Sequence, residues 1–128
     1  MRLLLDTHAL LWWLAGDRQL TRRARAAIGD EAGTVYVSAA SAWEVSTKHR
    51  IGKLPDAGAL ATDFAGVIAS QGFTALDITL DHAQRAGSLP GRHADPFDRM
   101  LIAQAQAGNL TLLSNERLFD DYGVTRLW

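Results

Sequence analysis

The sequence has 128 residues, with thirteen lysines and arginines against fourteen aspartates and glutamates, and no cysteine. A chain of this length fits one domain, residues 1–128, and can bury a core without cross-links. The lack of cysteine excludes disulfides and thiolate metal sites, and the formal charge of −1 gives no sign of a strongly basic nucleic-acid binder.

The first strand is expected at the start of the chain, where Leu3, Leu4 and Leu5 form an apolar run. A run without polar residues is typical of a strand buried on both faces, in the interior of a parallel sheet that helices cover. Asp6 follows directly, so its carboxylate is expected at the carboxyl edge of the sheet, where α/β folds bind their ligands.

Residues 9–15 are apolar around the whole helix and include the adjacent Trp12 and Trp13, which point about 100° apart. This pattern predicts a buried helix or, alternatively, a helix with one tryptophan in a protein interface. The run is too short to span a bilayer, and Asp6 and His8 end the preceding apolar run before it reaches signal-peptide length. We therefore expect a soluble, cytoplasmic protein.

The rest of the chain alternates between strand-like and helical patterns. Further strands are expected at residues 34–37, 73–76, 110–113 and 124–127. Further helices are expected at residues 20–28, 38–50, 55–72, 79–86, 95–108 and 114–121. Strands that alternate with helices predict an α/β fold, a three-layer α/β/α sandwich around a five-stranded, mainly parallel sheet.

Four acids lie just after strand ends or in the first two turns of the following helices: Asp6, Glu44, Asp98 and Glu116. Because parallel strands end at a common edge of the sheet, this placement could gather them around one point. Crowded carboxylates repel one another, so they are tolerated when protonated or when a cation lies between them. Oxygen ligands, with no cysteine and no paired histidine motif, favour Mg²⁺ or Mn²⁺ over Zn²⁺.

Each acid also has a purely structural interpretation that the sequence leaves open. Asp6 could simply cap the helix that follows it, and Glu44 could pair with Lys48 four residues later on a helix surface. Asp95, which precedes a proline, is well placed to cap the helix at 95–108. Glu116 could be an ordinary acid of a first helical turn.

Several segments, taken in order, form a specific set of motifs. They are Leu-Leu-Leu-Asp-Thr-His at 3–8, Ser-Ala-Ala-Ser-Ala-Trp-Glu-Val at 38–45, Gly-Lys-Leu at 52–54, His-Ala-Asp-Pro-Phe-Asp-Arg-Met-Leu-Ile-Ala-Gln-Ala at 93–105, and Leu-Leu-Ser at 112–114. In this order they resemble the PIN-domain ribonuclease toxins of the VapC kind. The resemblance covers essentially the whole chain, and the Asp-Pro-Phe-Asp-Arg block is its most specific part.

The resemblance implies a PIN-like domain that acts as the endoribonuclease toxin of a toxin–antitoxin pair. It also implies a homodimer, a small VapB-like antitoxin as partner, RNA as substrate, and Mg²⁺ or Mn²⁺ as cofactor. By position, Asp6, Glu44 and Asp98 match the family's most regular acids and are the expected metal ligands and catalytic residues. Where the family often has a fourth aspartate, this chain has Glu116, a fourth catalytic candidate whose longer side chain could reach the metal directly, through water or not at all. Asp95 is a possible substitute for it or a helper from outside the ligand set.

The expected mechanism has a metal on Asp6 and Asp98 that binds a phosphate oxygen and activates a water, while Glu44 orients that water or holds a second ion. Thr7 and Ser114 could position water or phosphate by their hydroxyl groups. The candidates for binding RNA through positive charge are Lys48 and Arg99, followed by Arg92 and His93 on the preceding loop.

Two other functions remain open from the sequence. One is a catalytically silent PIN-like module that binds RNA or a protein. The other is a phosphatase with Asp6 as nucleophile, but that chemistry normally needs a second aspartate two residues later, where this chain has His8.

Overall fold

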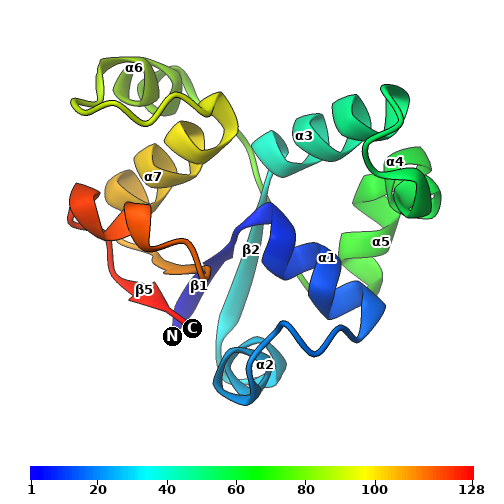
Figure 1. Cartoon of the computed structure of the whole chain (residues 1–128). Helices are drawn as coiled ribbons and strands as arrows, with labels where there is room; N and C mark the ends of the chain where they lie inside the picture. The colour runs from blue at the N-terminus through cyan, green and yellow to red at the C-terminus, as the bar shows by residue number, and fades with distance from the viewer.

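The computed structural model describes residues 1–128, and its five strands form one sheet in the order β3-β2-β1-β4-β5. The strands are β1 (Arg2–Leu5), β2 (Thr34–Ser38), β3 (Thr74–Leu76), β4 (Thr111–Leu113) and β5 (Arg126–Leu127). All neighbouring pairs are parallel, and the first strand of the chain lies in the middle. Helices cover both faces of the sheet (Figure 1), which confirms the predicted three-layer α/β/α fold.

The helices follow the strands in alternation, as the sequence predicts. They are α1 (Thr7–Ala15), α2 (Arg22–Gly29), α3 (Ala39–Arg50), α4 (Gly58–Thr62), α5 (Phe64–Ser70), α6 (Leu80–Ser88) and α7 (Pro96–Gly108), with two 3₁₀ helices, η1 (Pro55–Ala57) and η2 (Arg117–Tyr122). The helix predicted at 114–121 is therefore shorter and of the 3₁₀ type. None of the helices has the length and hydropathy needed to cross a membrane.

Side chains of β1 alternate between two hydrophobic cores, one on each face of the sheet. Leu3 and Leu5 pack in a core with residues of α1, α2, α3, α4 and α5. Leu4 points to the opposite face, into a second core with α7 and η2. All three leucines are buried, so each contributes about 1.5–3 kcal/mol of burial free energy, and both faces of this strand are fixed.

The prediction of one helix over residues 55–72 is wrong. The chain forms η1 and α4 before Asp63, leaves the helical conformation at that residue, and continues as α5. Asp63 leaves the helical region (φ −142°, ψ 68°), and its carboxylate accepts the N–H of Gly66 at 3.1 Å to cap α5. A Cβ at position 66 would be too close to that carboxylate, so a larger residue there would displace the cap. The apolar spacing continues across the break because Leu60 and Ile68, one on each side, are both buried in the same core.

Two helices that begin at the carboxyl edge of the sheet have polar caps at their N-termini. The Asp95 carboxylate accepts the N–H groups of Phe97 at 2.9 Å and Asp98 at 3.1 Å, which confirms the predicted cap of α7. The Ser38 hydroxyl accepts the N–H of Ala40 at 3.0 Å and caps α3. These caps fix the first turns of α3 and α7 at the edge where β1 ends.

Candidate active site

A small pocket of about 90 Å³ lies at the carboxyl edge of the sheet, where β1 and β4 end. The first turns of α1, α3 and α7 lie near one another above the end of β1 (Figure 1). None of the lining residues is hydrophobic, and we call this site the acidic pocket; its lining residues are Asp6, Thr7, His8, Glu44, Lys48, Asp95, Asp98, Asn115 and Glu116. The structure therefore brings the four acids predicted from the sequence to one site.

Asp6 is both a helix cap and a wall of the acidic pocket. One carboxylate oxygen accepts the N–H of Ala9 at 2.7 Å, and the other accepts the hydroxyl hydrogen of Ser114. Burial raises the pKa of the Asp6 carboxyl against these two hydrogen bonds, and the negative charge of Glu44 raises it further. Asp6 thus keeps its carboxylate near a second acid at an energetic cost.

Glu44 lies in the second turn of α3 and is 4% exposed, which is unusual for a glutamate. Its carboxylate pairs with the ammonium group of Lys48, whose side chain is about one-third exposed. The predicted pair between turns of α3 is present, but it faces the acidic pocket. A hydrogen bond of 2.9 Å between the hydroxyls of Thr7 and Ser41 joins α1 to α3 beside this pair.

Asp98 lies in the first turn of α7, with its carboxylate 2.9 Å from Nε2 of His93. Burial raises the pKa of Asp98 to about 6, and the negative charges of Asp95 and Glu44 add to the effect of burial. The hydrogen bond from His93 acts in the opposite direction. Glu44 therefore couples electrostatically to both Asp6 and Asp98.

Arg99 holds the loop that carries His93. Its guanidinium donates hydrogen bonds to the backbone carbonyls of Ala86 at 3.1 Å, Leu89 at 2.5 Å and His93 at 3.0 Å. The His93 ring also packs edge-on against buried Phe119, with 6.4 Å between ring centroids. Three of the five N–H donors of Arg99 are therefore used by carbonyls of the neighbouring main chain.

The other predicted residues at this site are engaged with the main chain or with neighbouring side chains. The exposed Glu116 caps η2 by accepting the N–H of Leu118 at 3.2 Å. Asp95 caps α7. Ser114 is fully buried, donates to Asp6 and accepts the N–H of Glu116 at 2.9 Å.

Sequence reasoning missed Asn115 and gave His8 no role, although both line the acidic pocket. Asn115 follows β4 by two residues, so the rule that selected the acids after strand ends could have found it. An adjoining pocket of about 290 Å³ shares Glu44 and Lys48 with the acidic pocket and adds Lys53. The structure thus places a second lysine beside the acids.

The donor set of the acidic pocket suits a hard divalent cation, because it offers carboxylate and amide oxygens and no sulfur. No three histidine, aspartate or glutamate side chains form a ready ligand set as they stand. Instead Asp6, Glu44 and Asp98 each bind a hydrogen-bond donor of the protein, Ser114, Lys48 and His93 respectively. The raised pKa values of Asp6 and Asp98 indicate that these donors do not fully offset the cost of burying the charged carboxylates.

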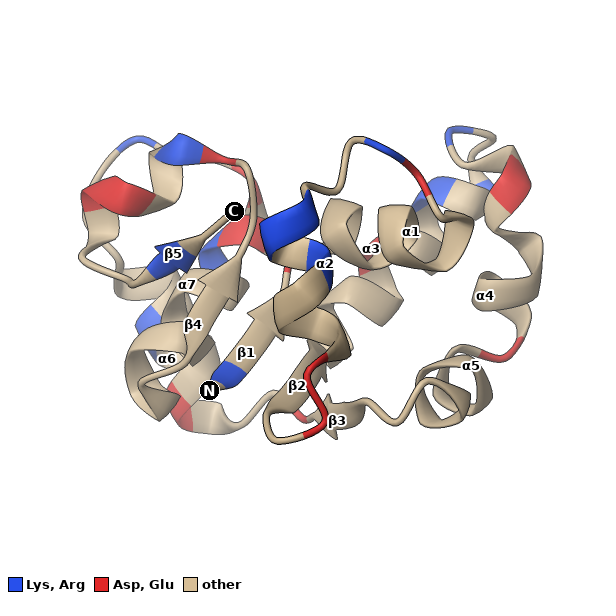
Figure 2. Ribbon diagram, turned by 90° about the horizontal axis from the view of Figure 1, so that it is seen from below, with Lys and Arg blue, Asp and Glu red and all other residues tan.

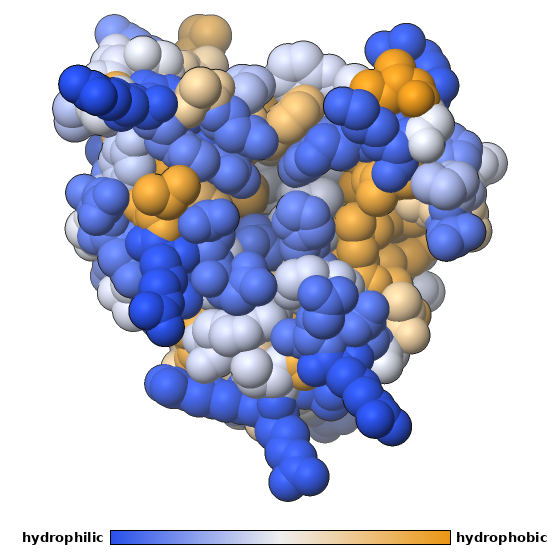
Figure 3. All heavy atoms as spheres, in the orientation of Figure 1, coloured by the Kyte–Doolittle hydropathy of each residue, from blue (hydrophilic) through white to orange (hydrophobic).

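The surface around the site is polar but not uniformly charged. Acidic and basic segments are interspersed along the ribbon in Figure 2. Hydrophilic atoms cover the middle of the face in Figure 3, and a hydrophobic area lies toward α4 and α5. A ligand that approaches this face therefore meets local positive groups, such as Lys48 and Lys53, rather than a general basic field.

Comparison with known families gives one match, to the PIN domain, over residues 3–124. The chain belongs to the PIN domain family. No curated protein matches the sequence of this PIN domain.

Solved structures of VapC-type toxins share the fold of this PIN domain. VapBC2 from Rickettsia felis, bound to a promoter DNA fragment, matches with TM-score 0.71 and 15% identity over 99% of this chain and 98% of that chain. VapC20 from Mycobacterium tuberculosis, a toxin that cleaves the sarcin–ricin loop, matches with TM-score 0.68 and 17% identity over 96% of both chains. A toxin–antitoxin complex from Klebsiella pneumoniae matches with TM-score 0.62 and 21% identity over 89% and 86%.

Proposed function

We propose that this PIN domain is a divalent-metal-dependent endoribonuclease and the toxin of a toxin–antitoxin pair. The observation that carries the proposal is the acidic pocket, where buried Asp6 and partly buried Asp98 have raised pKa values and share the field of Glu44. Burying such a cluster of carboxylates lowers the stability of the fold. Carboxylates with perturbed pKa values in a polar pocket are typical of catalytic sites. Membership of the PIN family supports the nuclease assignment.

Mg²⁺ or Mn²⁺ would be held by Asp6 and Asp98, with Glu44 beside them. When bound, such an ion supplies positive charge to a phosphate oxygen and lowers the pKa of a coordinated water. The protein contributes the placement of the oxygen ligands: Ser114 and the α1 backbone orient Asp6, and His93 orients Asp98. Glu44 remains to orient the attacking water for in-line attack on phosphorus.

Positive charge for the RNA would come from Lys48 and Lys53, which adjoin the acids. Lys48 balances Glu44 and, being about one-third exposed, can also reach a phosphate. We assign Thr7 and Ser114 to positioning rather than to direct substrate contact, because both hydroxyls are buried in hydrogen bonds to neighbouring side chains. Arg99 has the same positioning role through the loop.

We infer that the partners are an antitoxin of the VapB kind and a second copy of this chain. Support comes from the fold neighbours, several of which are VapBC complexes, including one from Salmonella typhimurium bound to DNA. This chain also has apolar surface that a partner could cover. An apolar groove of about 240 Å³ runs between α3, α5 and β3, and Trp43 on α3 is 61% exposed.

The nuclease is tested by measuring cleavage of a mixed RNA substrate with Mg²⁺ or Mn²⁺ and with a chelator. We expect cleavage by the parent only with the metal, and a loss of at least about a hundredfold in Asp6→Asn and Asp98→Asn, since each removes a charged ligand. Asp81→Asn, an exposed acid of α6, is the matched control and should cleave normally. Undiminished cleavage by either site variant would refute the assignment.

A binding module without catalysis is the second candidate. It is favoured by one observation: all three central acids already have protein donors, and no ready ligand set is present. The same experiment separates the two. A silent module retains RNA binding and shows no cleavage with any divalent ion.

A further inference from the structure

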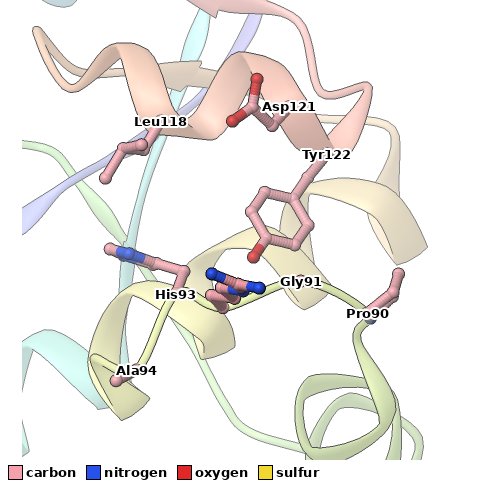
Figure 4. A pocket seen from close by; sticks show the side chains of 8 residues that line it. Pro90, Gly91, His93, Ala94, Leu118, Asp121 and Tyr122 are labelled. Atoms are coloured by element: carbon pink, nitrogen blue, oxygen red, sulfur yellow. The ribbon is translucent and has the colours of Figure 1, made fainter.

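A large cavity lies beside the acidic pocket, between the loop that leads into α7 and the helix η2. It has a volume of about 570 Å³ and is lined by residues 90–94 and by Leu118, Asp121 and Tyr122. We call it the loop pocket. Figure 4 shows Leu118 and Tyr122 extending from η2 toward His93 and the loop. The volume is in the range of small-molecule binding sites, and the proposed cleavage chemistry does not use this space.

Tyr122 has its backbone fixed to α7, and its ring lies close to the loop. Its hydroxyl lies against Gly91, where a Cβ would be only 2.8 Å from the tyrosine oxygen, and Gly91 has a positive φ of 91°. The backbone carbonyl of Tyr122 accepts a hydrogen bond from the side chain of Gln106 on α7 at 3.1 Å. The loop pocket therefore has a preformed aromatic wall that needs little ordering when a ligand binds.

His93 connects the loop pocket to the acidic pocket. Its side chain lines the loop pocket, and its Nε2 lies 2.9 Å from the carboxylate of Asp98, which lines the acidic pocket. Buried Phe119 supports the imidazole from behind. A ligand in the loop pocket is thus one side chain away from the acids.

We propose that the loop pocket binds one unstacked nucleobase of the RNA strand whose neighbouring phosphate lies at the acidic pocket. This inference rests on the proposed RNA cleavage and adds a subsite to it. Tyr122 and His93 offer aromatic surfaces, and Leu118, 48% exposed, adds an apolar contact. Single-stranded RNA is commonly recognised by bases that leave the stack and pack on aromatic side chains.

The edge of the loop pocket has groups that suit a nucleotide. Arg92 is exposed and can stack on a base or bind the adjoining phosphate, as a guanidinium does both. Asp121 is exposed and can accept hydrogen bonds from amino or imino groups of a base. Aromatic, cationic and acceptor groups therefore surround the same cavity.

The test is a titration of the ¹⁵N-labelled full chain, without metal, with AMP, CMP, GMP and UMP, followed by backbone amide shifts. We expect at least one nucleotide to shift the amides of Gly91, Arg92 and Tyr122, and ribose 5-phosphate, which lacks a base, to leave them in place. The inference is overturned if no nucleotide moves these amides, or if ribose 5-phosphate moves them equally.

Variants at Tyr122 and Gly91 test whether the base stacks on the aromatic wall. Tyr122→Leu should weaken nucleotide binding by roughly tenfold, the scale of one base–aromatic stack, whereas Tyr122→Phe keeps the ring and should bind as the parent does. Gly91→Ala should also weaken binding, because the new methyl group displaces the tyrosine hydroxyl. Gly72→Ala is its control, since Gly72 also has a positive φ of 75° and a Cβ there meets nothing within 4 Å. Equal binding by Tyr122→Leu and the parent would exclude the stack.

This titration is independent of cleavage, so the two proposals can fail separately. Nucleotide shifts without metal-dependent cleavage would leave the base site in place and remove the nuclease. Cleavage without nucleotide shifts would leave the nuclease in place and remove the base site.

Discussion

Asp98 shows the conflict between function and stability at the scale of one residue. Its pKa of about 6 in the folded protein, against an ordinary value of 3.8, means that the folded state binds a proton more tightly than the unfolded state. The stability contributed by protonated Asp98 is fully present below about pH 4 and is lost as the pH rises through 6. At neutral pH without metal, the charged carboxylate is therefore a destabilising group.

We expect Asp98→Asn to be more stable than the parent in chelator at pH 7.5, by about 1–3 kcal/mol, because asparagine cannot ionise. The difference should shrink as the pH falls toward 4, where Asp98 is protonated. Urea unfolding at both pH values measures it, with Asp81→Asn as the control. A variant less stable than the parent at pH 7.5 would show that the charged carboxylate of Asp98 does not destabilise the folded protein.

At the scale of elements, the segment between α6 and α7 is held by one side chain. Arg99 donates to two carbonyls of this segment, those of Leu89 and His93, and to the carbonyl of Ala86 in the last turns of α6. His93, near the end of the segment, contacts Asp98. The loop therefore positions a histidine by means of an arginine that lies on the following helix. Lysine cannot replace it, because one ammonium group cannot span three separate carbonyls.

We expect Arg99→Lys to open this loop and to raise the rate of tryptic cleavage after Arg92 by about tenfold, since hydrogen bonds to a charged donor contribute about 1.5–3 kcal/mol. RNA cleavage should fall with it, because His93 is no longer held against Asp98. Limited proteolysis under native conditions measures the opening. Arg85→Lys, an exposed residue of α6 paired with Asp81 at 3.7 Å, is the control. Equal tryptic rates for Arg99→Lys and the parent would refute the positioning role.

How far the sequence predicts each element depends on how local its cause is. Leu3 to Leu5 predict a central strand because burial on both faces leaves no polar residue in the run. Asp63 breaks the helix predicted at 55–72 because its cap and the glycine after it act against a continuous apolar spacing. The spacing of apolar residues alone does not distinguish one helix from two successive helices that bury the same face.

At the scale of the whole molecule, the predictable part of the site is the part that topology dictates. Asp6 and Asp98 follow from a strand end and a helix start, which a parallel sheet brings to one edge. The contact of His93 with Asp98 and the wall formed by Tyr122 depend on the path of a loop across η2, and no sequence period encodes that path. Long-range packing therefore sets the loop pocket.

The net charge of the chain, like the spacing of its residues, does not predict the local arrangement of groups at the site. A net charge of −1 gives no sign of a broad basic surface, yet Lys48 and Lys53 adjoin the acids locally. Salt-sensitive binding through few phosphates is the expected result, since each phosphate contact releases counterions. Affinity for RNA would then depend on the subsites at the edge of the sheet rather than on net charge.

The account depends on Asp6 and Asp98 holding one divalent ion beside Glu44, and Mn²⁺ binding followed by electron paramagnetic resonance tests this most directly. We expect the parent and Asp81→Asn to bind Mn²⁺ at a site that Mg²⁺ competes for, and Asp6→Asn and Asp98→Asn each to lose most of that affinity. Unchanged Mn²⁺ affinity in Asp98→Asn, or no binding by the parent at millimolar Mn²⁺, would contradict the account.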